Sequence, residues 1–298
     1  MQGPELAEGL DAYLAAVRRP GPLPLETARL LADRDAHRIA LAQPKGMTVA
    51  DSHAVGQGRE TPLRIYRPAG EGAQPAIVYF HGGGFTTGSI ASYDSLATAL
   101  AEATGATVVS VHYARLPEAT PRAMLAECAS VLGWVARMAE VLRIDPGRLT
   151  VAGDSAGAFL ATNLAAQSTG PTLVCQLLCY GAYALDANLA ADDPGLPRPV
   201  IEAMVDTWRA CSARDAEPLA LDLSGMPPAI LLTGEHDAFR TEGQAYAARL
   251  RAAGVHVTER IAPGMCHGFL RALAFSEPAR AAMAWLGESY REQLARTH

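Results

Sequence analysis

The sequence predicts an α/β fold in which a mostly parallel central sheet is flanked by helices and covered by a helical cap. Three observations predict it: short apolar runs recur along the chain, helix-length segments separate them, and glycine-rich turns follow several of the runs directly. Continuous apolar runs are typical of parallel strands that are buried on both faces. Ligand sites in such sheets lie outside the carboxyl ends of the strands.

Residues 1–45 precede the predicted sheet and contain two runs of apolar side chains at helical spacing. The first run covers residues 6–17 and the second covers residues 25–41. A segment rich in proline and glycine, residues 19–24, separates them. We therefore predict that residues 1–45 form cap helices.

The remaining residues, 46–298, are predicted to form the α/β core. Its strands are expected at residues 61–67, 76–80, 106–111, 149–152, 173–179, 229–232 and 255–261. Its helices are expected at residues 93–104, 121–143, 156–167, 241–253 and 274–295.

One connection in this core is too long for a plain crossover. It runs for about 50 residues between the strands expected at 173–179 and 229–232. It contains a Pro-Gly-Leu-Pro turn at residues 194–197 and an amphipathic run at residues 200–208. We predict that residues 181–227 are an inserted segment that completes the cap.

Composition and charge exclude several classes of protein. Of the 298 residues, 49% are apolar and 19% are charged, which is typical of a globular protein and not of a disordered chain or a membrane protein. The net charge of −6 comes without a basic stripe, so we expect neither nucleic acid nor a membrane surface as a partner. Residues 1–10 lack the basic and apolar regions of a secretory signal, and we expect a cytoplasmic location.

The cysteines give no sign of a disulfide framework or a metal site. There are five, they are scattered, and no two of them form a Cys-x-x-Cys pair. We expect reduced thiols, no metal and no cofactor.

A Gly-x-Ser-x-Gly motif at residues 153–157 predicts the nucleophile, Ser155. An apolar strand precedes the motif and an alanine-rich helix follows it. A serine at the tip of such a turn needs neighbours without side chains two positions before and after it, because the turn must close tightly to expose Oγ. The start of the following helix favours negative charge that develops at an attacked carbonyl. The alternative is an ordinary tight turn.

A second glycine-rich turn, at residues 82–84, follows the strand expected at 76–80. Its backbone N–H groups can point at an oxyanion, together with the N–H of the residue after the nucleophile. We therefore predict an oxyanion hole formed by Gly83, Gly84 and Ala156. His81, at the start of the turn, is interpreted as a structural residue.

The base and the acid are expected in late turns of the sheet. A serine hydroxyl needs a base near neutral pH, and His267 lies in the turn between the last expected strand and the last helix. Asp237 lies after the strand expected at 229–232, where it can orient the imidazole. Glu235 competes for this role, and Asp222 is a more distant competitor.

With these residues in place, the chain resembles the bacterial hormone-sensitive-lipase-like (family IV) esterases over nearly its whole length. The match rests on residues 81–85, 153–157 and 267–269 and on two further segments, Arg64-Ile65-Tyr66-Arg67-Pro68 and residues 222–228, in the same order. The resemblance implies an α/β-hydrolase fold, with the triad in the order Ser155, Asp237, His267. It also implies cofactor-free hydrolysis of short-chain carboxylic esters beneath a helical cap, and it allows a homodimer.

The chain departs from the family pattern at four places. Arg115 is shifted by one position relative to the usual Tyr-Arg-Leu-Ala-Pro-Glu segment, and His112 stands where an aspartate is frequent. Ala158 replaces a common glycine after the nucleophile, and Asp237-Ala238-Phe239 replaces Asp-Pro-Leu. These changes affect the surroundings of the triad and leave its members in place.

The function predicted from the sequence is that of a serine carboxylesterase that works through an acyl-enzyme intermediate. Two other functions stay open. An amidase or peptidase would use the same triad, and a ligand-binding receptor would use the same fold without a base. His267 argues against the receptor, whereas the sequence does not identify the natural ester.

Overall fold

A central sheet with helices on both faces organises the chain in the computed structural model. The structure describes residues 4–17, 23–56, 58–167, 169–186, 191–211 and 217–296. Within them, eight strands form one sheet in the order β1-β2-β4-β3-β5-β6-β7-β8. The strands are β1 (Thr48–Gly56), β2 (Arg59–Arg67), β3 (Gln74–Phe80), β4 (Thr107–Val111), β5 (Ile144–Asp154), β6 (Leu173–Cys179), β7 (Ala229–Gly234) and β8 (Val257–Ala262).

The direction of the strands agrees with the predicted α/β-hydrolase architecture. β1 pairs with β2, and β2 with β4, in antiparallel fashion, and the pairs from β4 to β8 are all parallel. β3 and β4 have nearly all their side chains buried because helices cover both faces of the sheet. The carboxyl ends of β3, β5 and β7 consequently point to one edge, where the turns with the candidate residues begin.

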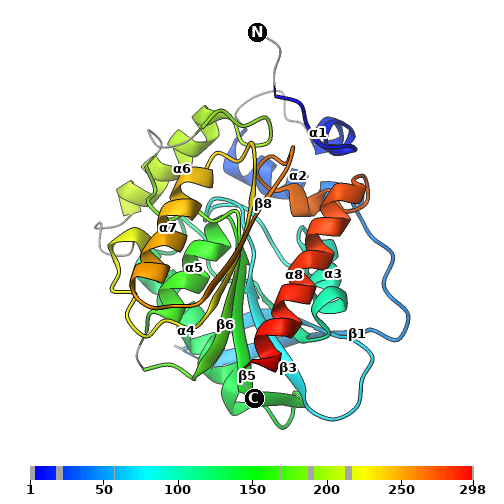
Figure 1. Cartoon of the computed structure of the whole chain (residues 1–298), viewed down its shortest axis with the longest axis vertical. Helices are drawn as coiled ribbons and strands as arrows, with labels where there is room; N and C mark the ends of the chain where they lie inside the picture. Colours follow the sequence, from blue (N-terminus) through cyan, green and yellow to red (C-terminus); the bar gives the residue numbers. More distant parts are fainter. Residues whose placement is uncertain are drawn as a thin grey trace.

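Each face of the sheet has its own apolar core. One core contains side chains from α4 (Pro121–Arg137), α5 (Ala156–Ala165), α6 (Arg198–Cys211) and α7 (Arg240–Ala252). The other contains side chains from α1 (Leu10–Val17), α3 (Asp94–Thr104) and α8 (Glu277–Ala295). Figure 1 shows α3 and α8 side by side on one side of the sheet, with α4, α5 and α7 on the other.

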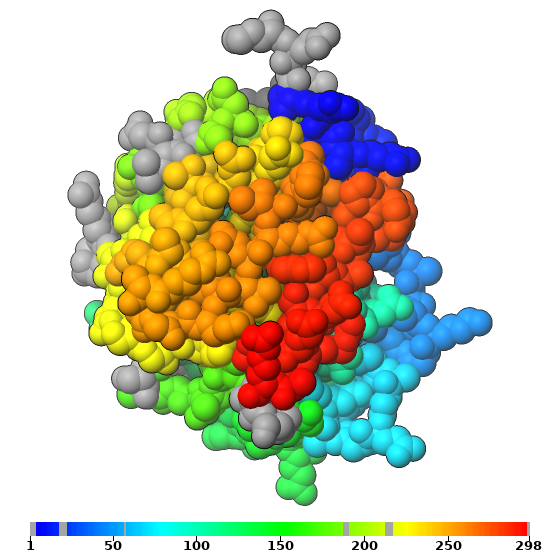
Figure 2. Space-filling view, in the orientation of Figure 1, coloured from blue at the N-terminus to red at the C-terminus, as the bar shows by residue number. Residues whose placement is uncertain are grey.

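The N-terminal helices and the inserted helix lie at the same end of the molecule. Figure 1 shows α1, α2 (Leu25–Ala36) and α6 together at the end opposite the C-terminus. The segment before α1 is joined to the turn after β8, because Ala7 N–H donates to the carbonyl of Gly264 (2.9 Å). Figure 2 shows this N-terminal segment on the surface against the chain that leads into α8.

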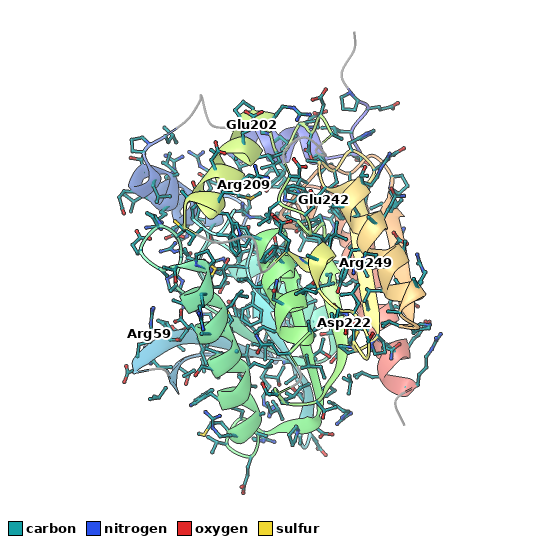
Figure 3. All side chains as sticks on the ribbon, turned by 90° about the vertical axis from the view of Figure 1, so that its left-hand side faces the viewer. Arg59, Glu202, Arg209, Asp222, Glu242 and Arg249 are labelled. Carbon is teal, nitrogen blue, oxygen red and sulfur yellow. The ribbon has the colours of Figure 1, made fainter. Side chains whose placement is uncertain are left out.

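The inserted segment is held to α7 at two points. Near the start of α7, the Glu242 carboxylate accepts the backbone N–H groups of Tyr183 (2.6 Å) and Ala184 (2.8 Å). Further along, the Arg249 guanidinium donates to the carbonyls of Leu219 and Leu221. Figure 3 shows Glu242 and Arg249 at successive positions along α7, with Arg209 on the neighbouring α6.

Several helices are shorter than the sequence pattern predicts, and the largest differences are at the ends of α2 and α4. The run at 25–41 gives a helix that ends at Ala36, because Ile39 leaves the helix to enter the core with 3% of its surface exposed. The run at 121–143 gives α4, which ends at Arg137, and the chain then turns through Arg143 with φ 51° into β5. Apolar periodicity continues beyond a helix when the next turn is also buried.

Among the residues that the structure describes, no helix is both long enough and apolar enough to cross a bilayer.

Candidate active site

Ser155 lies at the tip of the turn between β5 and α5 in a conformation that side-chain-bearing residues rarely adopt. Its φ is 53° and its ψ is −121°. A Cβ on Gly153 would collide with the backbone of Gly157, and a Cβ on Gly157 would collide with the carbonyl of Phe80. The backbone N–H of Ser155 donates to the carbonyl of Cys179 (2.9 Å) and so ties the turn to β6. The motif therefore folds as the strained turn that it predicts.

The imidazole of His267 bridges the serine and the aspartate. Its Nε2 lies 2.8 Å from Oγ of Ser155, and its Nδ1 lies 3.1 Å from Oδ1 of Asp237. All three side chains are buried, with 7%, 9% and 1% of the surface of Ser155, His267 and Asp237 exposed. We assign the proton of the neutral imidazole to Nδ1, because Asp237 Oδ1 can only accept, which leaves Nε2 free to accept from Oγ.

Opposing effects determine the pKa of His267. Burial disfavours the imidazolium and lowers the pKa, whereas the charge and hydrogen bond of Asp237 raise it, with help from Asp193 and Asp154. The carboxylates together outweigh burial, so the pKa of His267 lies above its usual value of 6.5.

The glycine turn at residues 82–84 leaves backbone N–H groups free near the serine. Gly83 and Gly84 have φ values of 112° and 59°, which favour glycine. The carbonyl of Gly83 accepts from the N–H (2.9 Å) and the hydroxyl (2.9 Å) of Thr87, so this carbonyl points toward the following residues of its own loop. Within the described parts of the chain, no hydrogen bond uses the N–H groups of Gly83, Gly84 or Ala156.

Asp154 connects this turn to the nucleophile. Its Oδ1 accepts both the N–H of Gly82 (2.8 Å) and the hydroxyl of Tyr79 (2.6 Å). Burial raises the pKa of Asp154 to about 6, although both hydrogen bonds oppose the shift. The sequence motif leaves this position unspecified, so only the fold reveals that the residue before Ser155 holds the glycine turn at residues 82–84.

His81 is a buried residue at the start of the turn, and its ring has packing and hydrogen-bond partners there. Its ring stacks on Tyr93 and Tyr113 at centroid distances of 5.4 and 4.4 Å. Nδ1 lies 2.9 Å from the carbonyl of Gly82, and burial lowers the pKa of His81 to about 3. A neutral imidazole here supports the shape of the turn.

The competing acids have structural positions outside the triad. Glu235 is exposed, and its carboxylate accepts the N–H of Gly264 (2.8 Å). Asp222 is also exposed and accepts the N–H of Ser224 (3.0 Å). Cys266 precedes His267, but burial raises the pKa of its thiol to about 12, which leaves it protonated near neutral pH.

The helix α6 packs directly against the glycine turn at residues 82–84 and against Phe85, which follows it. Trp208 has 3% of its surface exposed, and its ring lies 4.4 Å from that of Phe85 and 4.8 Å from that of Phe159. A Cβ added to Gly84 would lie 3.2 Å from Cγ of Met204. The helix α6 and the glycine turn are therefore in contact in this structure.

Two further residues, Arg29 and Asp193, bind backbone groups of distant segments, and no sequence motif identifies either of them in advance. Arg29 of α2 donates to the carbonyls of Thr86 (2.8 Å) and Leu116 (2.9 Å) and pairs with Glu118 (2.6 Å). Asp193, which precedes α6, has a buried carboxylate that accepts four backbone N–H groups. Both contacts depend on backbone groups that only the fold brings within reach.

One cluster has the residue types of a metal site. Ligand atoms of Asp193, Asp237 and His267 lie within 4.8 Å of one another. The oxygens of Asp193 are engaged by backbone N–H groups, and Oδ1 of Asp237 faces the imidazole. These contacts already form a hydrogen-bond network that uses both oxygens of Asp193, Oδ1 of Asp237 and Nδ1 of His267.

Comparison with known proteins agrees with this geometry. A family model described as alpha/beta hydrolase fold matches residues 77–271, which include the three bridged side chains. The chain belongs to the hormone-sensitive-lipase-like esterase family of the α/β-hydrolase fold. The carboxylesterase NlhH of Mycobacterium tuberculosis is similar to it, with 39% identity over 240 residues that cover 74% of this chain and 75% of the relative.

Other proteins named as esterases are similar in sequence or in structure. An arylesterase of Saccharolobus solfataricus is 32% identical over 226 residues, covering 71% of this chain and 73% of that protein. The solved structure of a hyperthermophilic esterase from Pyrobaculum calidifontis superposes with a TM-score of 0.87 at 29% identity, covering 96% of each chain.

Proposed function

We propose that the protein is a serine carboxylesterase in which Ser155 attacks the ester carbonyl, His267 is the general base and Asp237 orients the imidazole. The observation that carries the proposal is the double contact of His267, 2.8 Å from the hydroxyl and 3.1 Å from the carboxylate. Relatives named carboxylesterase and arylesterase support the substrate class.

The reaction proceeds in two steps that use the same histidine. In the first, Oγ of Ser155 attacks the carbonyl carbon, Nε2 of His267 takes the hydroxyl proton and returns it to the departing alcohol, and an acyl-enzyme forms. In the second, water loses its proton to Nε2, attacks the acyl carbonyl, and the acid leaves as Oγ recovers the proton. Asp237 stabilises the imidazolium in both steps.

The oxyanion of each tetrahedral intermediate would accept the N–H groups of Gly83, Gly84 and Ala156. Their freedom from other hydrogen bonds among the described residues supports this role. Ala156 is also the first residue of α5, where the helix dipole favours negative charge. Donors held by a folded backbone need no reorganisation as charge develops.

Residues 1–45 and 181–227 would act as the cap over this site. α2 contacts the loop that follows the glycine turn through Arg29 and Thr86, and α6 contacts it through Trp208 and Phe85. Apolar side chains from a cap restrict the volume left for the acyl group, which favours short acyl chains. In residues 1–45 and 181–227, segments 1–3, 18–22, 187–190 and 212–216 lie outside the described residues.

Initial rates over p-nitrophenyl esters of rising acyl length test the activity. The proposal expects the highest kcat/KM with acetate or butyrate and weak turnover of the matched p-nitroanilides. Faster turnover of the anilides would favour an amidase. Binding of the esters without turnover would favour a receptor, an alternative against which the position of His267 argues.

Two further predictions concern the whole molecule. The family resemblance allows a homodimer without requiring one, and light scattering coupled to gel filtration distinguishes monomer from dimer through the molar mass in solution. The cytoplasmic location remains a sequence prediction, which fractionation of the source cells tests.

A further inference from the structure

We propose that Asp193 is a positioning residue that holds the loops of His267 and Asp237 in register and makes assembly of the triad depend on the inserted cap segment. The inference rests on the proposed esterase function. Asp193 lies between β6 and α6, far along the chain from both catalytic loops.

The same oxygen of Asp193 binds both catalytic loops. Its Oδ2 accepts the backbone N–H of His267 (2.9 Å) and that of Ala238 (2.9 Å), the residue that follows Asp237. The loop of Asp237 precedes α7 and the loop of His267 follows β8. One acceptor shared by both loops therefore fixes the distance between them. That distance determines whether Nδ1 of His267 reaches the carboxylate of Asp237.

The other oxygen of Asp193 binds the cap segment itself. Oδ1 accepts the N–H groups of Gly195 (2.6 Å) and Leu196 (3.1 Å), which shape the turn into α6. A backbone hydrogen bond adds a second contact nearby, because the N–H of Ala191 donates to the carbonyl of Ala238 (3.1 Å). The segment before α6 is thereby bound to the catalytic loops by both backbone and side chain.

The carboxylate of Asp193 is buried, with 7% of the residue exposed, and four N–H donors stabilise its charged form. Burial raises its pKa, and the charge of His267 opposes that shift. It lies close to the imidazole, since ligand atoms of Asp193 and His267 are within 4.8 Å. A second negative charge there stabilises the imidazolium that forms when Ser155 loses its proton.

The charged and titratable groups around the imidazole come from several elements. Asp237 lies after β7, Asp154 ends β5, Asp193 precedes α6, and Cys266 is the neighbour of His267 in the chain. Tyr180, after β6, packs its ring edge-on against the imidazole at 5.1 Å. Asp237, Asp193 and Asp154 all raise the pKa of His267.

The test compares Asp193→Asn with Asp192→Asn, its exposed neighbour in the same loop. The variant Asp193→Asn removes the charge and turns an amide toward one pair of N–H donors. We expect kcat for p-nitrophenyl acetate to fall about 10²-fold, where kcat is the rate divided by the concentration of active sites measured by titration. Misplacement of a catalytic group has effects of that size. We expect Asp192→Asn to keep the wild-type kcat.

The pH profile distinguishes positioning of the triad from a general loss of structure. We expect the acidic limb of kcat/KM to move to lower pH in Asp193→Asn, since the pKa of His267 loses a supporting charge. Wild-type kcat with an unmoved limb in the folded variant would overturn the inference. So would a loss of rate that disappears when the rate is divided by the number of titrated sites.

If Asp193→Asn does not fold, Asp193→Glu replaces it. This variant keeps the charge but has one more methylene, so it cannot satisfy both pairs of N–H groups in the same geometry. The inference expects a reduced kcat with the acidic limb at its wild-type pH, and wild-type kcat would overturn it. Failure of the wild type itself to hydrolyse esters would instead contradict the proposed esterase function.

Discussion

His267 and Asp237 are separated by 30 residues in the chain, yet Nδ1 of the imidazole lies 3.1 Å from Oδ1 of the carboxylate. The same Oδ1 also accepts the N–H of Phe239 (2.8 Å), which fixes the direction of the carboxylate. The acid therefore arrives with its accepting oxygen already aimed at the histidine. This arrangement makes Asp237, and not the exposed Glu235, the acid of the triad in our account.

Replacing the two acids separately tests that assignment. Asp237→Asn is expected to lower kcat about 10⁴-fold, because an amide can favour the wrong imidazole tautomer. Glu235→Gln retains an oxygen that can accept the N–H of Gly264, and its kcat is expected to stay within about twofold of wild type, as for most surface changes. Steady-state rates with p-nitrophenyl acetate measure both, and equal losses in the two variants would contradict the assignment.

The pH dependence of the reaction follows from the raised pKa of His267. The free enzyme needs the neutral imidazole, so activity is lost as the pH falls below that pKa. Because the carboxylates around it hold the pKa above 6.5, the acidic limb of kcat/KM is expected above pH 6.5. Rates in overlapping buffers, corrected with Ser155→Ala as a blank, measure the limb. A midpoint below pH 6 would show that burial dominates instead.

Asp154 offers a matched pair of substitutions that separates its hydrogen bonds from its charge. Both bonds end on Oδ1, so Asp154→Asn can keep them, and only a small loss of activity is expected. Asp154→Ala leaves the buried hydroxyl of Tyr79 and the N–H of Gly82 unpaired, at about 1–3 kcal/mol each. We expect a lower free energy of unfolding and a kcat at least about tenfold lower. Denaturant titration and steady-state kinetics measure them, and equal behaviour of the two variants would contradict this role.

Arg29 links α2 to Thr86 in the loop that follows the glycine turn at residues 82–84. Replacement of Arg29 is expected to affect activity more than global stability. Arg29→Lys cannot make the forked contacts with Thr86, Leu116 and Glu118, so we expect the turn to loosen and kcat to fall. Glu26→Gln is the control, since Glu26 is an exposed partner of Arg29 and such pairs contribute about 0–1 kcal/mol. Steady-state kinetics of both variants test this role of Arg29, and a wild-type kcat in Arg29→Lys would contradict it.

The fold was largely predictable because its signals are local. Apolar runs such as 76–80 and 173–179 mark buried strands, and the glycines at 153 and 157 are required by contacts with backbone atoms on either side. The limits of α2 and α4 were wrong because burial continues past the end of each helix. The spacing of apolar residues indicates which positions are buried, but it does not indicate where the helical hydrogen bonds end.

The predicted triad residues could be named from motifs, whereas their supports could not. Asp154, Asp193 and Arg29 act by accepting from or donating to backbone groups of distant segments. Backbone groups are the same in every residue, so the sequence contains no sign of which one a side chain will meet. Asp193 and Asp192 are chemically identical neighbours, and only the turn into α6 buries one and exposes the other.

In the proposed mechanism, Ser155 is the nucleophile that His267 activates. A fluorophosphonate reacts with such a serine, and mass spectrometry of the proteolytic peptides locates the adduct. We predict a single phosphonylated residue, Ser155, formed at a rate that falls with ester hydrolysis in His267→Ala. A stoichiometric adduct on any other residue, or full ester hydrolysis by protein whose Ser155 is fully phosphonylated, would contradict the account.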